Sequence, residues 1–309
     1  MTYRHAQKTD SVEIHPQPPF RLDLVAAALR RQPHNVVDRW DGECYRRVMS
    51  LPAGPVEAAV TQTGGTDAPV LEVDVCGAEA DALKVQDEAA RQLRRLLGVD
   101  VSLTEFHARA AADPDLGPLA LRFRGMRPPR FPDLFEALAN AIACQQVSLH
   151  VGIMTLNRLA ETFGKAGPGG SAFPRPDELR EHATDSGLRR LGFSFAKART
   201  LLRVADACTL GELSEAALAP LPDAEAIRHL TALRGVGRWS AEYALLRGLG
   251  RSHIFPGDDV GAQRHLAAWL DLAGRPDYDD VQAIMRRWSG YAGLVYLHLL
   301  LYRLQTDTL

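Results

Sequence analysis

Hydrophobic and polar positions follow two different periods in the two parts of this chain. From Phe20 to about Gly98, short runs that partly alternate, such as VLEVDVCG, are separated by turn-forming stretches such as PAGP and TGGTDAP. A period of two predicts the strands of an antiparallel meander. The next run, AEADALKVQDEAARQLRRLLG, places leucine and alanine at helical spacing and stops at Gly98. We therefore predict a small α+β domain, an antiparallel sheet with helices, over residues 20–100.

Beyond Val101 the helical period dominates. Runs of helix length are separated by breaks rich in glycine and proline, among them RGMRPPRFP, GKAGPGGSAFPRP and GRSHIFPG. One run, DLFEALANAIACQQVSLHVGIMTLNRLAETFG, has no internal break, and GKAGPGGSAFP is typical of a flexible surface loop. The sequence pattern therefore predicts an all-α region over residues 101–309. Residues 1–19 mix charge with proline and lack the apolar segment of a secretory signal, which predicts a flexible leader.

Composition narrows the classes of function. The four cysteines form no C-x-x-C pair, so neither a zinc site nor an iron–sulfur cluster is indicated. No apolar run is long enough to cross a bilayer, and we expect a cytoplasmic protein with no membrane partner. The formal net charge of −2 gives no overall attraction to nucleic acid. Any such binding must come from a local basic surface and from backbone donors.

The most informative stretch, at about residues 229–250, reads HLTALRGVGRWSAEYALLRGLG. A helical run ends at Leu233, Gly235 and Gly237 flank Val236, and a new helix begins near Arg238. Two glycines permit positive φ in a tight hairpin and a close backbone approach, and the amides of the second helix suit a phosphate. An ordinary turn between helices explains Gly-Val-Gly equally well, so the surrounding residues must decide.

Two adjacent carboxylates, Asp258 and Asp259, follow in GRSHIFPGDDVGAQRHL and open another predicted helix. One acid can cap the helix while the other projects into a cleft, where the helix dipole favours its ionised form. Trp239 and Tyr243 share one helix face, and Tyr291 is a third aromatic candidate for the same cavity. Core packing is the alternative explanation for each aromatic residue.

Together these residues resemble the helix–hairpin–helix DNA glycosylases, specifically the 3-methyladenine DNA glycosylase II (alkylpurine DNA glycosylase) family. The resemblance covers most of residues 17–309 and rests on LRGVGRWSAEYALLRGLG, IFPGDD, ANAIACQQVS, a C-terminal YLHLLLY and an initial QPPF. It implies an enzyme of base excision repair that flips alkylated bases, of the 3-methyladenine and 7-methylguanine class, out of double-stranded DNA. Hydrolysis of the N-glycosidic bond would release the base, and the enzyme would be a monomer that is associated with the nucleoid when bound to DNA.

The resemblance also assigns roles to individual residues. Asp259, twenty positions after Trp239, would be the catalytic carboxylate, which leaves Asp258 as the helix cap. Bifunctional relatives place a lysine nucleophile where this chain has Trp239, so a monofunctional enzyme without lyase activity is implied. The base pocket would be lined by Trp239, Tyr243 and Tyr291, which can stack on a cationic purine, and by Gln145.

The remaining assignments concern DNA and ions. Gln146 would take the position of the residue that wedges into the duplex, where the family often has leucine, and Tyr291 followed by Ala292 replaces Trp followed by Arg, which would open the pocket. The resemblance implies no cofactor beyond a structural Na⁺ or K⁺. The residues expected to contact DNA phosphate are Gly235, Val236, Gly237, Arg238 and Arg264, and the carbonyls expected to hold the cation belong to Thr231, Leu233 and Gly235.

Three alternatives differ from this interpretation in specific residues. A non-catalytic helix–hairpin–helix DNA-binding protein would not need an acid at Asp259, and a bifunctional glycosylase/lyase for oxidised bases would need a lysine in place of Trp239. A small-molecule enzyme with an all-α substrate domain would need a nucleotide loop, metal cluster or nucleophile elbow, none of which the sequence contains.

Overall fold

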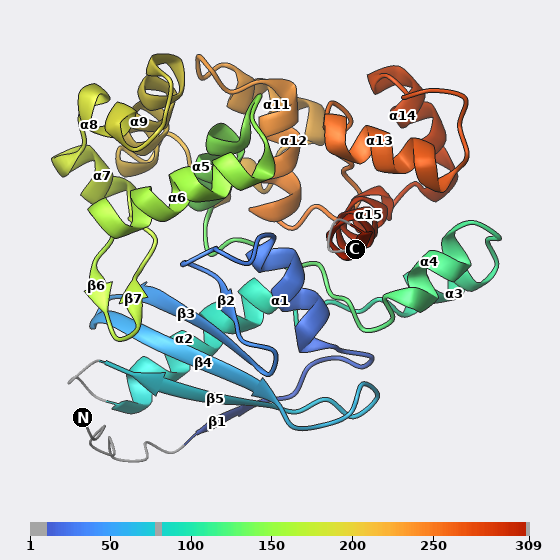
Figure 1. Ribbon diagram of the computed structural model, residues 1–309, viewed down its shortest axis with the longest axis horizontal. Helices are drawn as coiled ribbons and strands as arrows, with labels where there is room; N and C mark the ends of the chain where they lie inside the picture. The colour runs from blue at the N-terminus through green and yellow to red at the C-terminus, as the bar shows by residue number, and fades with distance from the viewer. Residues whose placement is uncertain (1–10, 78–81, 307–309) are drawn as a thin grey trace.

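The computed structural model describes residues 11–77 and 82–306, and it divides them into a sheet-containing part and a helical part (Figure 1). The five-stranded antiparallel sheet has the order β1-β5-β4-β3-β2. Apolar residues alternate with polar ones along β5, where Leu71, Val73 and Val75 are buried. Its strands are β1 (Val12–Ile14), β2 (Arg39–Trp40), β3 (Cys44–Leu51), β4 (Gly54–Gln62) and β5 (Leu71–Cys76).

Two helices bury the apolar face of this sheet. They are α1 (Leu22–Arg30) and α2 (Ala82–Leu97), whose inner leucines, alanines and valines share one core with the strands. Gly98 follows α2 with φ of +64°, as expected for a glycine that ends a helix. The α+β domain predicted from the alternating pattern is thus confirmed.

The expected leader is wrong in its second half. Val12 pairs with Val73 and Ile14 with Leu71, so this segment is an edge strand of the sheet, and the backbone N–H of Gln17 donates to the carbonyl of Val99 (2.9 Å). Three residues are too few for an alternating pattern to be recognised, which explains the error. Residues 1–10 of the expected leader lie outside the described residues.

Helices make up nearly all of the second part, as predicted. They surround α5, in which residues 134–143 are all buried against α6, α9 and α12. No helix within residues 11–77 or 82–306 is long and apolar enough to cross a membrane. The helices are α3 (Thr104–Ala111), α4 (Leu116–Arg122), α5 (Leu134–Cys144), α6 (Leu149–Phe163), α7 (Pro176–His182), α8 (Asp185–Arg190), α9 (Phe195–Thr209), α10 (Glu215–Leu218), α11 (Asp223–Thr231), α12 (Arg238–Arg247), α13 (Val260–Trp269), α14 (Tyr278–Met285), the 3₁₀ helix η1 (Arg286–Trp288) and α15 (Ala292–Thr306).

Two local differences from the sequence pattern affect the site. The unbroken run of residues 133–164 divides into α5 and α6, because Gln146 adopts φ of +54° and the side chain of Ser148 caps α6 by accepting from the N–H of Val151. The expected flexible loop GKAGPGGSAFP instead forms a hairpin of β6 (Ala166–Gly167) and β7 (Gly170–Ser171), which lies against β4 (Figure 1).

A buried ion cluster joins the sheet to the helical part. The guanidinium of Arg47, on β3, donates to the carboxylates of Asp38 (2.7 Å) and Glu136 (2.6 Å), and Tyr45 donates its hydroxyl to Asp38 (2.6 Å). All four side chains are nearly inaccessible to solvent. Because Glu136 belongs to α5, this cluster fixes the helix that leads into the site described next.

Candidate active site

The hairpin between α11 and α12 consists of three residues with separate tasks. Gly235 has φ of +99°, and a Cβ there would overlap the side chain of Thr200, so only glycine fits. Val236 is 4% exposed and anchors the turn in the core. Gly237 is the N-cap of α12 and has φ of −90°, and a Cβ added there would have no atom within 4 Å. The expected positive φ is therefore confirmed at Gly235 and wrong at Gly237.

The first turn of α12 is suited to an anion. In the described structure no side chain caps this helix, so amides of its first turn have no side-chain acceptor, and Gly237 is exposed. Free amides and the positive end of the helix dipole point in the same direction. A helix N-terminus with this geometry can bind an anion such as a phosphate.

A cavity of about 1170 Å³ opens beside the hairpin. Residues from α5, α12, α13 and α15 line it together with the hairpin itself. Of the residues singled out in the sequence, it brings together Gln145, Gln146, Gly235, Val236, Gly237, Trp239, Tyr243, Asp258, Asp259 and Arg264. A concave site of this size, with few polar groups converging in it, can enclose most of a small aromatic ligand.

The carboxylate of Asp259 accepts three hydrogen bonds at the edge of the cavity. Its Oδ1 accepts from the backbone N–H of Ala262 (2.9 Å), which makes Asp259 the N-cap of α13. Its Oδ2 accepts from the hydroxyl of Tyr296 (2.8 Å) and from the indole N–H of Trp239 (3.3 Å). Three donors from three elements thus orient one carboxylate toward the cavity.

The prediction that Asp258 caps this helix is wrong. The helix begins at Val260, so the cap falls on Asp259, whose extended backbone (φ −71°, ψ 103°) is the one a capping residue requires. Asp258 instead accepts two hydrogen bonds from Arg238, at 2.7 and 3.0 Å. Arg238 also stacks on the ring of Tyr278, with 3.4 Å between the guanidinium carbon and the ring centroid.

The aromatic side chains of the cavity differ in one member from the predicted set. Trp239 and Tyr243 lie there with ring centroids 5.7 Å apart. Tyr291 does not line the cavity formed by the described residues, since its hydroxyl donates to Glu105 (3.1 Å) and its ring contacts Phe106. Tyr296 lines the cavity instead of Tyr291.

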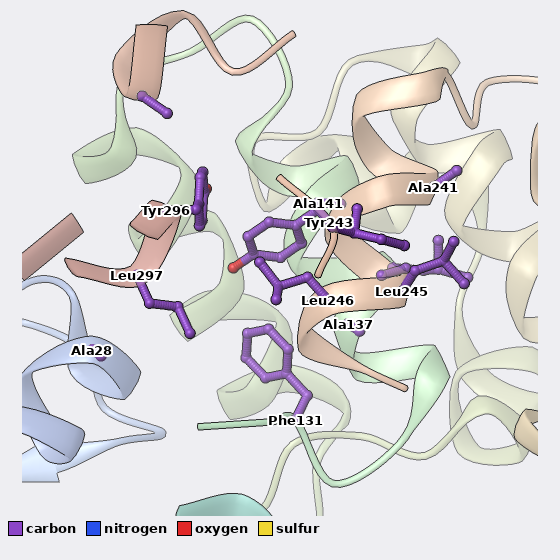
Figure 2. Packing of buried hydrophobic residues seen from close by; sticks show 14 of the residues in the cluster. Ala28, Phe131, Ala137, Ala141, Ala241, Tyr243, Leu245, Leu246, Tyr296 and Leu297 are labelled. Atoms are coloured by element: carbon purple, nitrogen blue, oxygen red, sulfur yellow. The ribbon is translucent and has the colours of Figure 1, made fainter. Parts of the chain in front are cut away.

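Tyr296 remains a hydrogen-bond donor because of its surroundings. Burial, and then the negative charge of Asp259, raise the pKa of its hydroxyl well above the ordinary value. Figure 2 shows Tyr296, from α15, and Tyr243, from α12, with the hydroxyl end of Tyr243 directed toward Tyr296. The run YLHLLLY contains this residue, but no periodicity distinguishes it from the other tyrosines.

The two glutamines at the end of α5 have different positions. Gln145 donates from Nε2 to the carbonyl of Gly235 (3.1 Å) and to the hydroxyl of Ser240 (2.9 Å), and so joins α5 to the hairpin. Gln146 is exposed at the rim of the cavity in a left-handed backbone conformation. Arg264, on α13, is also exposed on this rim. Their expected roles on DNA stay predictions.

Among the lining residues that sequence reasoning missed are Arg31, Asn140 and Cys144. Arg31 ends α1 and lies 212 positions from Tyr243, whose hydroxyl it contacts. Asn140 and Cys144 are on the inner face of α5, where apolar neighbours gave them the appearance of ordinary core residues. No short motif connects residues so far apart.

Family models match both parts of the chain. Residues 139–290 match the HhH-GPD superfamily base excision DNA repair protein, and residues 11–133 match the AlkA N-terminal domain. The first range contains the hairpin, Trp239 and Asp259, and the second contains the sheet. Both expectations drawn from the sequence, the family and the fold class, are confirmed.

Individual relatives agree with these models. A DNA-3-methyladenine glycosylase of Bacillus subtilis is 30% identical over 70% of this chain and 73% of its own length. The solved structure of a 3-methyladenine DNA glycosylase from Archaeoglobus fulgidus is 25% identical, with a TM-score of 0.80 over 94% of this chain and 98% of that one. An 8-oxoguanine glycosylase/lyase of Clostridium acetobutylicum bound to DNA, at 20% identity and a TM-score of 0.76 over 97% of both chains, shares the fold.

The hairpin, the fixed carboxylate and the aromatic cavity therefore occur in a chain that matches both family models and most of which is matched by one solved glycosylase structure. The chain belongs to the helix–hairpin–helix superfamily of base excision repair proteins and, within it, to the 3-methyladenine DNA glycosylase II family of DNA glycosylases.

Proposed function

We propose that this glycosylase removes alkylated purines from double-stranded DNA as a monofunctional enzyme. The observation that carries the proposal is the carboxylate of Asp259, held by Trp239 and Tyr296 in a cavity beside an open helix N-terminus. The amides of α12 bind a DNA phosphate, and the damaged nucleotide is extruded into the cavity.

Asp259 then acts on the sugar rather than on the base. As the N-glycosidic bond breaks, positive charge develops at C1′, and a carboxylate with a fixed orientation stabilises it without rearranging. The same carboxylate orients the attacking water or takes its proton. The products are a free base and an abasic site.

The absence of lyase chemistry is part of the proposal. A lyase step needs an amine that forms a Schiff base with the sugar, and the side chain at the start of α12 is the indole of Trp239, which has no nucleophilic nitrogen. Its N–H instead donates to the catalytic carboxylate. One residue thus removes lyase activity and orients the acid.

We further propose that a monovalent cation binds the carbonyl groups of the hairpin. The carbonyl of Leu233 accepts from the N–H of Val236 (2.9 Å) and that of Gly235 from Gln145 (3.1 Å), so each retains a lone pair. With the carbonyl of Thr231 these oxygens would hold Na⁺ or K⁺. The ion would add positive charge near the phosphate that the hairpin binds.

The test is release of base from methylated duplex DNA by the purified protein. We expect free 3-methyladenine and 7-methylguanine, an intact abasic strand, and no protein–DNA adduct when borohydride is present during turnover. An oxoguanine glycosylase/lyase assayed in parallel shows that trapping works. Failure to release either methylated base contradicts the proposed substrate class, and a trapped adduct contradicts the monofunctional mechanism.

A further inference from the structure

A buried positive charge lies in the wall of the cavity that contains Asp259. Arg31 is 6% exposed and lines this cavity. It follows the last residue of α1 with φ of +58°, a conformation in which glycine or asparagine is usual. A strained backbone under a long side chain persists only where the surroundings fix that side chain, and such positions concentrate at functional sites.

The partners of Arg31 are neutral. Its Nη1 donates to the hydroxyl of Tyr243 (3.3 Å), its Nη2 donates to the side-chain oxygen of Asn140, and its guanidinium carbon lies 5.6 Å from the ring centroid of Phe131. No carboxylate among the described residues forms an ion pair with it. A guanidinium has five N–H groups. Three of them donate to Tyr243, Asn140 and the carbonyl of Leu29 (3.4 Å), and a fourth faces the thiol of Cys144, so one N–H remains for a ligand in the cavity.

A second buried cation changes the role expected of Tyr243. The guanidinium of Arg247, which has no exposed surface, lies 5.9 Å from the ring centroid of Tyr243 and 4.9 Å from that of Phe131 (Figure 2 shows both rings). Tyr243 therefore already faces one guanidinium across its ring and another at its hydroxyl. It offers much less attraction to an incoming cation than an isolated tyrosine would.

Damaged purines differ in charge, and the charge of the base decides whether Arg31 attracts or repels it. A purine methylated on a ring nitrogen that carries no hydrogen, such as N7 of guanine, is a cation in DNA, and in this cavity it would lie near a fixed positive charge. Ethenoadenine is an exocyclic alkylation product that is neutral and presents ring nitrogens as acceptors. Such a base takes hydrogen bonds from a guanidinium without repulsion.

We propose that Arg31 is a specificity-determining residue, which favours neutral alkylated purines with a hydrogen-bond acceptor over cationic ones. This inference rests on the proposed function, because the cavity must receive the extruded base. Asp259 serves both kinds of lesion, since it acts at the sugar. Arg31 distinguishes them by the charge of the base.

The experiment compares single-turnover excision of ethenoadenine and of 7-methylguanine from duplexes that are otherwise identical. In Arg31→Met we expect the ratio of the two rates, ethenoadenine over 7-methylguanine, to fall about tenfold, the order of magnitude of one like-charge repulsion in such a site. Arg31→Gln removes the charge but can still bond to Asn140 and Tyr243, and it should show the same fall. Arg31→Lys keeps the charge and should keep most of the preference.

The ratio of the two rates does not depend on how much of the protein is active. Both rates come from one preparation, so the fraction of active protein cancels, and the different chemical stabilities of the two glycosidic bonds cancel between variants. Arg264→Met, which removes a positive charge from the exposed rim, is the matched control and should slow both reactions without changing their ratio.

The outcomes separate the two proposals. If the wild-type protein releases both bases and the neutral variants keep its ratio, or shift it toward ethenoadenine, the role of Arg31 is overturned while the proposed function stands. If the wild-type protein releases neither base, the proposed function fails and the role of Arg31 falls with it.

Discussion

At the scale of single residues, the two adjacent aspartates of the site bind different partners. Asp259 both caps α13 and presents its second oxygen to Trp239 and Tyr296, whereas Asp258 holds Arg238 at the surface. A carboxylate that is part of a helix cap cannot rotate freely. Its orientation is therefore set before substrate arrives, which is what stabilisation of a developing charge requires.

Asp259→Asn removes the negative charge of this side chain but keeps an oxygen that can cap α13. We expect base excision to fall by about 10²-fold or more, because the charge that we propose stabilises C1′ is lost. Asparagine caps helices about as well as aspartate, so thermal unfolding and binding to damaged DNA should change little. Single-turnover excision from alkylated duplex, with thermal unfolding measured beside it, checks both statements.

Asp258→Asn is the matched comparison. It loses one partly exposed ion pair, which contributes about 0.2–1 kcal/mol, and should keep most of the activity. An inactive Asp258→Asn together with an active Asp259→Asn would reverse the assignment of the two acids.

At the scale of elements, the hairpin between α11 and α12 has two glycines that are needed for different reasons. Gly235 is required by the fold, because of its positive φ and the nearby Thr200 side chain. Gly237 has an ordinary φ and free space, so nothing in the free protein demands glycine there. A close approach of DNA phosphate to the amides of α12 would explain it.

This difference predicts opposite results for two alanine variants. Gly237→Ala should stay folded, with a loss of at most about 1 kcal/mol from the weaker N-cap, yet bind DNA less tightly whatever its sequence. Gly235→Ala should lower the free energy of unfolding by about 1–3 kcal/mol through backbone strain. Thermal unfolding and DNA affinity measured together distinguish them. Wild-type affinity in a folded Gly237→Ala would contradict the phosphate site.

At the scale of the whole molecule, the sheet and the helices are joined by charges that water does not reach. Arg47 of β3 holds Glu136 of α5, and burial raises the pKa of Glu136 to about 7 despite the neighbouring cation. The other end of α5 leads through Gln145 to the hairpin. A change at this junction can therefore alter the site at a distance.

Arg47→Met should lower the free energy of unfolding by about 3–5 kcal/mol, because it leaves buried carboxylates without a cation. Glu136 then has a still higher pKa in the folded state, so the folded protein binds more protons than the unfolded one and stability falls as pH rises above about 4.5. The loss should be larger at about pH 8 than at about pH 6. Urea unfolding at both pH values measures it.

The neighbouring Arg46 provides the control for this prediction. It lies on the same strand but is partly exposed, and its ion pair with Asp41 is 3.8 Å long. Arg46→Met should cost less than about 1 kcal/mol, with little dependence on pH. Equal losses in the two variants would contradict a special role for the buried cluster.

The sequence by itself determined the features that short stretches of chain encode. Alternation separated the sheet from the helices, because the side-chain periods of strands and helices are local properties of the backbone. The glycines of the hairpin, and the spacing of Trp239 and Asp259, are likewise within one motif of about twenty residues. These features sufficed for the fold class, the family and the main residues of the site.

Only the tertiary structure decided which side chains share the cavity. Tyr296 lines the cavity and Tyr291 does not, and this difference arises only when α15 packs against its neighbours. Asp259 is the cap because α13 begins at Val260, and a helix that began one residue earlier would place the cap at Asp258. Arg31 reaches the site from 212 positions away, through a backbone conformation that its residue type does not favour. Such contacts arise from the packing of distant elements, so no local pattern records them.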